Sequence, residues 1–214
     1  MEIHYLDEVA STHLWLIDAI KAHRVTPPFA LSAQRQEGGI GSRGNRWIGY
    51  EGNLFLSFAL DAGRLPADLP RQSMSIYFSW ILKETLATFG SKVWLKWPND
   101  FYLGDKKAGG TITSILSGEI VICSIGLNLK QAPEEFAKID VSIDKRELLE
   151  SYFLKLKEER LWKEIFIKYK VEFFQSRKFR YFDQTTQKRV SLEDAVLQDD
   201  GSILLQNRRV YSLR

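Results

Sequence analysis

The chain has 214 residues, of which 44% are hydrophobic and 27% are charged. This composition supplies enough apolar material for one full α/β domain with a small appendage. The formal net charge of +3 is too small to indicate nucleic acid binding. No apolar run approaches the roughly 20 residues of a membrane span, and the N-terminus lacks the features of a signal peptide. We therefore expect a soluble, cytoplasmic protein that binds neither DNA nor membranes.

Cysteine and histidine usage gives no sign of a metal centre. The single cysteine, Cys123, excludes an internal disulfide framework, as expected in a reducing cytoplasm. Its place in the apolar run 120–125 favours a buried structural thiol over a nucleophile. His4, His13 and His23 stand apart, and the sequence has no CxxC or HExxH motif. The sequence therefore does not identify residues that would bind a metal ion, and a metal site stays unknown.

The spacing of apolar and turn residues predicts an α+β fold, with a mixed β-sheet that carries its helices on one face. Between Gly38 and Gly52 lie six of the 14 glycines, too dense for helix or strand. In chain order the predicted elements are a strand at 2–6, a helix at 12–22 capped by Ser11 or Thr12, strands at 29–33 and 53–60, a helix at 72–89, strands at 92–96, 101–103, 111–116 and 119–127, and helices at 144–157 and 161–174.

Beyond residue 175 the sequence changes to short predicted strands separated by turn residues. This texture predicts a small β-barrel of about 40 residues, a size at which an isolated core is only marginally stable. We therefore expect the barrel to pack on the main domain, with domains at residues 1–175 and 176–214.

A glycine-rich loop at residues 39–44 fits the pattern GxGxxG. A dinucleotide-binding loop needs a helix directly after it, whereas this loop is followed by more glycines and a strand. It is not a P-loop either, because Asn45 and Arg46 stand where Lys and Ser or Thr are needed. Free backbone amides, Arg43, Arg46 and the aromatic Trp47 suit an anion carried by a flat ring. The loop is either a clamp for a nucleotide or acyl phosphate, or a flexible surface loop.

Three further motifs follow at the ends of predicted strands. KWPND at residues 96–100 uses its proline to hold Asn99 rigidly at a strand edge. KKAGG at residues 106–110 places Lys107 where it can bridge a carboxylate and a phosphate, beside glycines that let a ligand approach the backbone. SIGLN at residues 124–128 ends in a carboxamide that can bond a ribose or a phosphate. Each motif also has a purely structural interpretation, as a turn or a strand cap, and only their combination indicates a site.

In this order and separation, the motifs resemble those of the biotin protein ligases. The resemblance rests on Ser11-Thr12, the loop QEGGIGSRGNRW, KWPND, KKAGG and SIGLNL, and it covers nearly the whole chain. The terminal RVYSLR resembles the end of that family's SH3-like domain. The resemblance implies a class II synthetase-like catalytic domain that binds biotin and ATP at residues 1–175, and an SH3-like domain at 176–214.

The implied activity is an ATP-dependent ligase that uses Mg²⁺. It adenylates biotin and then transfers it to a lysine of the biotin carboxyl carrier protein of acetyl-CoA carboxylase. Longer members of the family carry an N-terminal helix-turn-helix and repress transcription. Too few residues precede Ser11 for such a domain, so we expect no DNA-binding role. Whether the chain forms a homodimer stays open, because some members of the family pair through edge strands and others do not.

Carried over residue by residue, the resemblance implies Lys107 as the principal catalytic residue, with Arg43 as a second cation. The positions implied to bind ATP or the adenylate are Arg43, Arg46, Trp47, Asn99 and Asn128. The positions implied to bind biotin are Ser11, Thr12, His13, Gln36, Gly39, Ile40, Gly41, Ser42, Lys107 and Gly110.

The glycine-rich loop departs from the family's GRGRxxR motif. Ile40, Ser42 and Asn45 stand in place of its three arginines. Arg43 and Arg46 lie one residue from two of these positions, and they either supply the charge in a shifted register or leave the adenylate more loosely held.

Two further departures and three rival interpretations stay open. His13 stands where the family has Asn, and Ser124 where it usually has Gly. The rivals are a lipoate–protein ligase, a non-catalytic module that binds biotin or a nucleotide, and a nucleic-acid-binding protein. The third depends on basic clusters at residues 177–180 and 208–209, which equally suit a solvated face.

Overall fold

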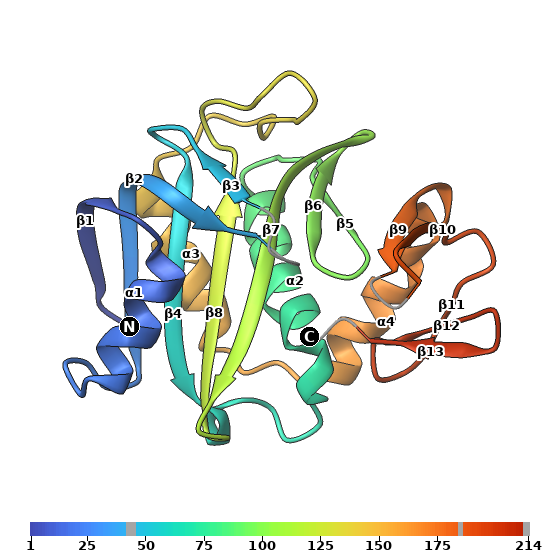
Figure 1. Ribbon diagram of the computed structural model, residues 1–214, viewed down its shortest axis with the longest axis horizontal. Helices are drawn as coiled ribbons and strands as arrows, with labels where there is room; N and C mark the ends of the chain where they lie inside the picture. Colours follow the sequence, from blue (N-terminus) through green and yellow to red (C-terminus); the bar gives the residue numbers. More distant parts are fainter. Residues whose placement is uncertain (42–45, 184–185, 212–214) are drawn as a thin grey trace.

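A computed structural model describes residues 1–41, 46–183 and 186–211. Its centre is one large mixed sheet with the strand order β1-β2-β4-β8-β7-β6-β5, to which β3 adds by pairing with β2 (Figure 1). The edge strand β1 runs parallel to β2, and the other neighbours are antiparallel. The strands are β1 (Ile3–Val9), β2 (Phe29–Ile40), β3 (Arg46–Gly49), β4 (Leu54–Asp61), β5 (Trp94–Lys96), β6 (Asp100–Leu103), β7 (Lys106–Leu116) and β8 (Ile120–Leu127).

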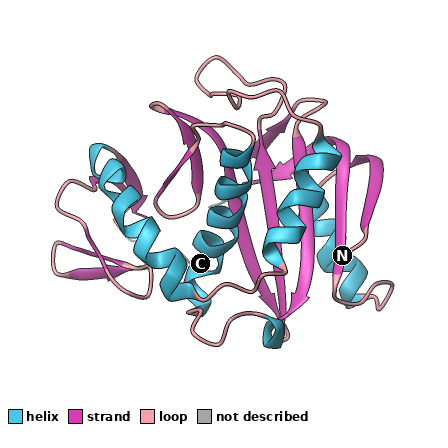
Figure 2. Cartoon of the chain, turned by 180° about the vertical axis from the view of Figure 1, so that it is seen from behind, coloured by secondary structure: helices cyan, strands magenta, loops and turns pink. Residues whose placement is uncertain are grey.

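The main hydrophobic core lies between this sheet and α2 (Met74–Thr88), α3 (Lys145–Leu156) and α4 (Trp162–Phe173). Figure 2 shows α2 and α3 in front of the sheet, with α4 beside it, when the chain is seen from behind. Along β4, Leu54, Leu56 and Phe58 enter this core because alternate residues of a strand point to one face. Cys123 of β8 is fully buried among them, in agreement with the expected structural thiol.

The first helix, α1 (Thr12–Lys21), packs on the opposite face of the sheet. Leu16 and Ile20 of this helix form a second, smaller core with Leu31, Ala59 and Ile122 of three central strands. The expectation that all helices lie on one face is therefore wrong for α1. The rest of this second face carries no long helix among the described residues, which leaves room for a binding site (Figure 1).

Two stretches that the sequence assigned to loops are strands. The expectation that residues 38–52 contain no strand is wrong, because β2 extends to Ile40 and pairs with β3. Here the glycines permit close approach of two strands: a Cβ at Gly49 would lie 2.2 Å from the carbonyl oxygen of Gln36. Similarly, β7 begins at Lys106 rather than at residue 111, so that the KKAGG motif lies in a strand.

The C-terminal segment forms two small antiparallel sheets rather than one closed barrel within the described residues. It packs on the main domain as expected, since Tyr181, Leu192 and Ile203 belong to the main hydrophobic core. In addition, Nε1 of the fully buried Trp97 donates a hydrogen bond of 2.9 Å to the carbonyl of Gly201. The strands are β9 (Arg180–Asp183) with β10 (Lys188–Ser191), and β11 (Val196–Leu197) with β12 (Ile203–Leu205) and β13 (Arg208–Val210).

Short 3-10 helices complete the described elements: η2 (Ala62–Arg64), η3 (Arg71–Ser73) and η4 (Phe174–Lys178). No helix of the described residues is long and apolar enough to span a membrane.

Candidate active site

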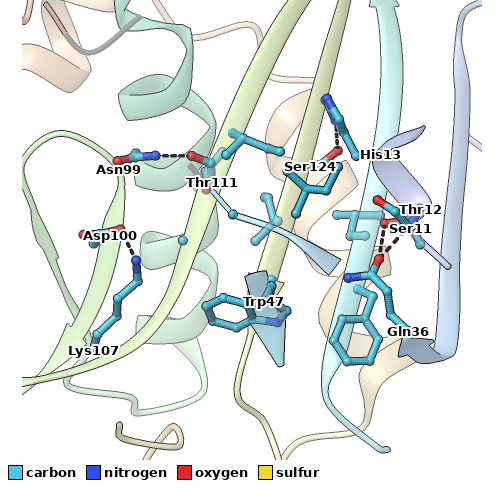
Figure 3. A pocket seen from close by; sticks show the side chains of 18 residues that line it. Ser11, Thr12, His13, Gln36, Trp47, Asn99, Asp100, Lys107, Thr111 and Ser124 are labelled. Atoms are coloured by element: carbon cyan, nitrogen blue, oxygen red, sulfur yellow. Dashed lines mark hydrogen bonds and ion pairs between the residues drawn. The ribbon is translucent and has the colours of Figure 1, made fainter. Parts of the chain in front are cut away.

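A cleft opens on the face of the sheet that carries α1, and it encloses about 480 Å³ including its open mouth. Figure 3 shows polar side chains from α1 and β2 at one end, a lysine and a carboxylate from the β6–β7 hairpin at the other, and Trp47 between them. The lining residues are Ser11, Thr12, His13, Gln36, Ile40, Gly41, Trp47, Phe55, Leu56, Asn99, Asp100, Lys107, Gly110, Thr111, Ile112, Ser124, Ile125 and Gly126.

The first end of the cleft is built at the N-terminus of α1. Ser11 caps this helix, and its Oγ accepts a long hydrogen bond of 3.4 Å from the backbone N–H of Leu14. The next residue, Thr12, is held by Gln36 of β2. Its backbone N–H and its hydroxyl both donate to Gln36 Oε1, at 2.9 and 3.1 Å. Because both bonds use the oxygen, the amide nitrogen of Gln36 stays available as a hydrogen-bond donor beside the cleft.

A chain of hydrogen bonds continues from Thr12 across the floor of this end. Ser57 of β4 donates to Thr12 Oγ1 at 2.9 Å, and its Oγ lies 2.7 Å from that of Ser124 on β8. His13 Nδ1 lies 2.8 Å from Ser124 Oγ, and His13 Nε2 lies 3.3 Å from Ser114 Oγ on β7. Burial lowers the pKa of His13 below 6.5, so the ring is neutral at pH 7. Among the described residues, this end of the cleft is therefore polar but uncharged.

The second end of the cleft is charged. Lys107 Nζ forms an ion pair of 2.6 Å with Asp100 Oδ1, and Lys96 Nζ lies 3.9 Å from the other carboxylate oxygen. The Lys107 side chain keeps 28% of its surface exposed, so it can still reach a ligand. Gly110 leaves space beside the pair, since a Cβ there would meet Asp100 Oδ1 at 3.3 Å. Two lysines facing one carboxylate make this end suited to an additional anion.

Asn99 stabilises the same hairpin. Its side-chain amide donates a short hydrogen bond to the carbonyl of Thr111, whose hydroxyl accepts a hydrogen bond from Ser79 of α2 at 2.8 Å. The amide nitrogen of Asn99 therefore has a structural partner, and its oxygen remains for a ligand.

Trp47 of β3 lies across the middle of the cleft, against Gly126 of β8. A Cβ on Gly126 would come within 2.8 Å of indole atom Cε2, so only glycine leaves room for this ring position. The indole Nε1 is buried without a hydrogen-bond partner among the described residues. It is a donor placed in the cleft wall, where a ligand can satisfy it.

Most of the predicted site residues gather in this one cleft. Those that line it are Ser11, Thr12, His13, Gln36, Ile40, Gly41, Trp47, Asn99, Lys107 and Gly110.

The remaining predicted positions fall into three groups. Gly39 lies next to the cleft, where a Cβ would meet Gln36 Nε2 at 2.5 Å. Ser42 and Arg43 lie outside the described residues, and so does the side chain of Arg46, whose backbone begins β3. Asn128 is not among the lining residues.

The amide of Asn128 is bonded within the protein. Its nitrogen donates to the carbonyl of Ala137 at 3.0 Å, and its oxygen accepts from Asn53 at 3.3 Å. Asn128 thus holds the segment after β8 against β4, and a direct contact with the nucleotide stays a prediction.

Sequence reasoning missed several residues of the cleft. Asp100 was treated only as part of a turn, and Phe55 and Ile112 lie on strands that looked like ordinary core. Their signal is the two-residue alternation, which places Phe55 on the face opposite the main core. The alternation assigns these residues to a face of the sheet, but it predicts a binding role only once that face is known to carry a site.

No group of three or more His, Cys, Asp or Glu side chains that could hold a metal ion occurs in the described part of the chain.

Comparison with known proteins identifies the family to which this fold and this cleft belong. The chain belongs to the biotin/lipoate A/B protein ligase family, whose sequence model matches residues 6–129. Within that family, the chain is similar to the biotin acetyl coenzyme A carboxylase synthetase of Helicobacter pylori, whose crystal structure contains biotinylated ATP. The two are 36% identical, each is covered to 98%, and the TM-score is 0.92.

A more distant relative shares the fold, and another is similar in sequence. The biotin protein ligase of Aquifex aeolicus, solved with biotin and ATP, is 23% identical with a TM-score of 0.77, covering 100% of this chain and 96% of that one. The bifunctional ligase/repressor BirA of Salmonella typhimurium is 31% identical over 131 residues. That match covers 59% of this chain and 40% of BirA, so the chain matches less than half of the length of this curated relative.

Proposed function

We propose that this chain is a biotin protein ligase, which joins biotin to AMP and then transfers it to a lysine of a biotin carboxyl carrier protein in the cytoplasm. The observation that carries the proposal is the division of one cleft into an uncharged hydrogen-bonding end and a cationic end (Figure 3). Biotin has the same division, with a neutral ureido ring at one end and a carboxylate at the other. The relative from Helicobacter pylori, which was solved with biotinylated ATP, supports this assignment.

The ring of biotin binds at the end formed by α1 and β2. There the Nε2 of Gln36 donates to the ureido oxygen, and hydroxyl oxygens such as that of Thr12 accept from the ring N–H groups. Phe55 and Ile112 supply apolar surface next to these polar groups. Such a mixture of apolar wall and few polar groups fixes the orientation of a ligand.

In the first step, a carboxylate oxygen of biotin attacks the α-phosphorus of ATP. A new P–O bond forms, the bond to the β-phosphate bridging oxygen breaks, and pyrophosphate leaves with the electron pair. Lys107 contacts both the carboxylate and the α-phosphate, because it lies at the cationic end and is the more exposed of the two lysines near Asp100. Its charge offsets the repulsion between these two anions and stabilises the charge that develops on the phosphate oxygens.

Trp47 and the Asn99 oxygen lie beside the adenylate formed in this step, Trp47 with its indole N–H as a donor. Mg²⁺ bound to the triphosphate would neutralise part of its charge. In the second step, the amine of the acceptor lysine attacks the biotinyl carbonyl, the C–O bond to AMP breaks, and the amine loses a proton. The protein contributes mainly by holding the reactants in position and by excluding water from the mixed anhydride.

The experiment that tests this proposal follows both steps separately. Purified protein is incubated with Mg·ATP and either biotin or lipoate, and pyrophosphate release is measured with and without a biotin acceptor domain. We expect pyrophosphate release that depends on biotin, and transfer of biotin to the acceptor lysine. Release with lipoate alone would instead assign the chain to the lipoate branch of the family. Tight biotin binding without release would show a non-catalytic binding module.

A further inference from the structure

The hydrogen-bond chain on the floor of the cleft has a direction that can be worked out from one fixed point. The backbone N–H of Thr12 can only donate, so the Gln36 atom 2.9 Å away must be the oxygen. The Thr12 hydroxyl approaches the same oxygen at 3.1 Å and must donate to it as well. This bond uses the one hydroxyl hydrogen of Thr12, which leaves Thr12 Oγ1 only as an acceptor.

Each following member of the chain is then fixed in turn. Ser57 must donate to Thr12, so Ser124 must donate to Ser57. Ser124 therefore accepts from His13 Nδ1, and this nitrogen must carry a proton. In a neutral ring the other nitrogen, Nε2, then accepts from the hydroxyl of Ser114. All the hydrogen bonds in this series therefore point the same way, from donor to acceptor, from Ser114 through His13 to Gln36.

This direction decides what the cleft offers to a ligand. Thr12 and Ser124 both line the cleft, and both have spent their hydroxyl hydrogens inside the chain. Their oxygens retain lone pairs but no hydrogen, so toward the ligand they act only as acceptors. Ser57 lies between them and is fully buried.

We propose that His13 and Ser124 form a positioning pair that sets the direction of this series of hydrogen bonds. The pair thereby makes the ring-binding end of the cleft selective for ligands that donate N–H groups, such as a cyclic urea. The proposal rests on the proposed function. It adds a role for His13 that needs no contact with the ligand: His13 supplies the proton on Nδ1 that forces Ser124 to donate away from the cleft. Without that proton, the Ser124 hydroxyl is free to rotate, and the acceptor set is no longer fixed.

The tautomer of His13 is the first measurement. The ¹⁵N chemical shifts of a histidine ring distinguish a protonated Nδ1 from a protonated Nε2, and the wild-type protein at neutral pH is the sample. We expect His13 to be the neutral Nδ1–H tautomer. A neutral Nε2–H tautomer would overturn the proposal, because Ser124 would then have to donate to His13. A purely structural role for the residue predicts neither result.

Substitutions test the consequence for binding. Ser124→Ala removes an acceptor and leaves the His13 proton unpaired, so we expect the Kd for biotin to rise about 10- to 100-fold. His13→Asn places an amide nitrogen near the position of Nδ1 and should stay within about threefold of wild type. His13→Gln places its amide further out and should weaken biotin binding about tenfold, whereas in the Ser124→Ala background the same change should add little.

A matched control is available on the neighbouring strand. Ser32 of β2 is fully buried, and its hydroxyl has no hydrogen-bond partner among the described residues. Ser32→Ala therefore removes a buried serine hydroxyl of the same sheet without changing the hydrogen bonds between Ser114 and Gln36, and biotin binding should not change.

Two readouts separate this proposal from the proposed function. The KM for ATP should stay within about twofold of wild type in the His13→Gln variant, because ATP phosphates bind at the opposite, cationic end. If wild type turns over biotin but Ser124→Ala and His13→Gln leave its Kd unchanged, the positioning pair is wrong and the ligase assignment stands. If wild type does not bind biotin, the proposed function itself fails.

Discussion

Trp47 lies directly against Gly126, so closely that a methyl group at residue 126 would meet the indole at 2.8 Å. Carbon atoms that are not bonded do not approach so closely, and either the ring or the strand must therefore move. Gly126 is paired on both sides, with Phe55 of β4 and with Gly110 of β7, so the strand resists movement more than the ring does. Gly126 thus fixes the indole in the middle of the cleft, between its uncharged and cationic ends.

Gly126→Ala should displace Trp47 and weaken nucleotide binding. We expect the KM for ATP to rise about tenfold, with a loss of stability of about 1–3 kcal/mol from overpacking. Steady-state kinetics and urea unfolding measure the two effects. Gly63→Ala is the control, because a Cβ there meets no atom within 4 Å, and it should change stability by less than about 0.5 kcal/mol. An unchanged KM in Gly126→Ala would show that Trp47 does not contact the nucleotide.

The buried neutral His13 predicts a pH dependence of stability. Burial lowers its pKa in the folded state below 6.5, so the unfolded chain binds a proton at a higher pH than the folded one. The contribution of His13 is therefore most favourable above pH 6.5 and falls as the pH decreases through that value. Free energies of unfolding between pH 5 and 8 should decrease toward pH 5 more steeply for wild type than for His13→Asn. Parallel curves would contradict a neutral buried histidine.

A second pH-dependent contribution comes from Glu84 of α2. Burial raises its pKa, but hydrogen bonds from Arg160 and Lys168 outweigh this effect and bring the pKa down to about 2. A carboxylate whose pKa is lowered by folding stabilises the folded state at pH values above its unperturbed pKa of 4.5. This contribution is lost as the pH falls from 4.5 toward 2.

Glu84→Gln should therefore cost about 1–2 kcal/mol at pH 7, after allowance for solvent screening, and close to nothing near pH 2. Urea unfolding of both proteins at several pH values measures the difference. A cost that does not depend on pH would mean that the lost contribution is packing rather than charge.

The C-terminal segment should be needed for the stability of the main domain. Gly201 accepts a hydrogen bond from the buried indole of Trp97, and the ring of Tyr181 packs edge-on against that indole at 5.8 Å. Trp97→Phe leaves the Gly201 carbonyl without this donor and should cost about 1–3 kcal/mol. We expect a single cooperative transition at lower temperature in calorimetry. Separate melting of two units, with the larger one unaffected, would contradict a shared core.

The sequence predicted several residues that line the cleft better than the surroundings that hold them. Lys107, Asn99 and Trp47 belong to short local motifs, and such motifs can be recognised without knowledge of the fold. Ser57 and Ser124 join His13 only because two strands pair in register across the sheet, which places Ser57 directly opposite Ser124. That register depends on long-range packing, which no local pattern specifies.

The error on the glycine-rich segment has a similar cause. Gly49 reads as a strand breaker in isolation, because glycine weakens a strand. In the fold it pairs with Gln36, at a place where only a residue without a side chain fits. Likewise, α1 could not be assigned to the second face of the sheet, because the amphipathic pattern of a helix shows that one side is buried but not against which face.

The central claim is that Lys107 stabilises the transfer of the biotin carboxylate to the α-phosphate. The most direct measurement is biotin-dependent exchange of labelled pyrophosphate into ATP, which reports the first step without an acceptor protein. Lys107→Ala is compared with Lys106→Ala, its neighbour on β7, whose Nζ donates only to the backbone carbonyl of Glu134 in the described structure.

We predict that Lys107→Ala lowers the exchange rate about 100- to 1,000-fold, as expected for the loss of one positioned charge at a reacting phosphate. Lys106→Ala should retain the wild-type rate within about twofold, with both variants folded by circular dichroism. Equal rates in wild type and Lys107→Ala would contradict the account, because the charge that it places at the reacting atoms would then have no effect on the reaction.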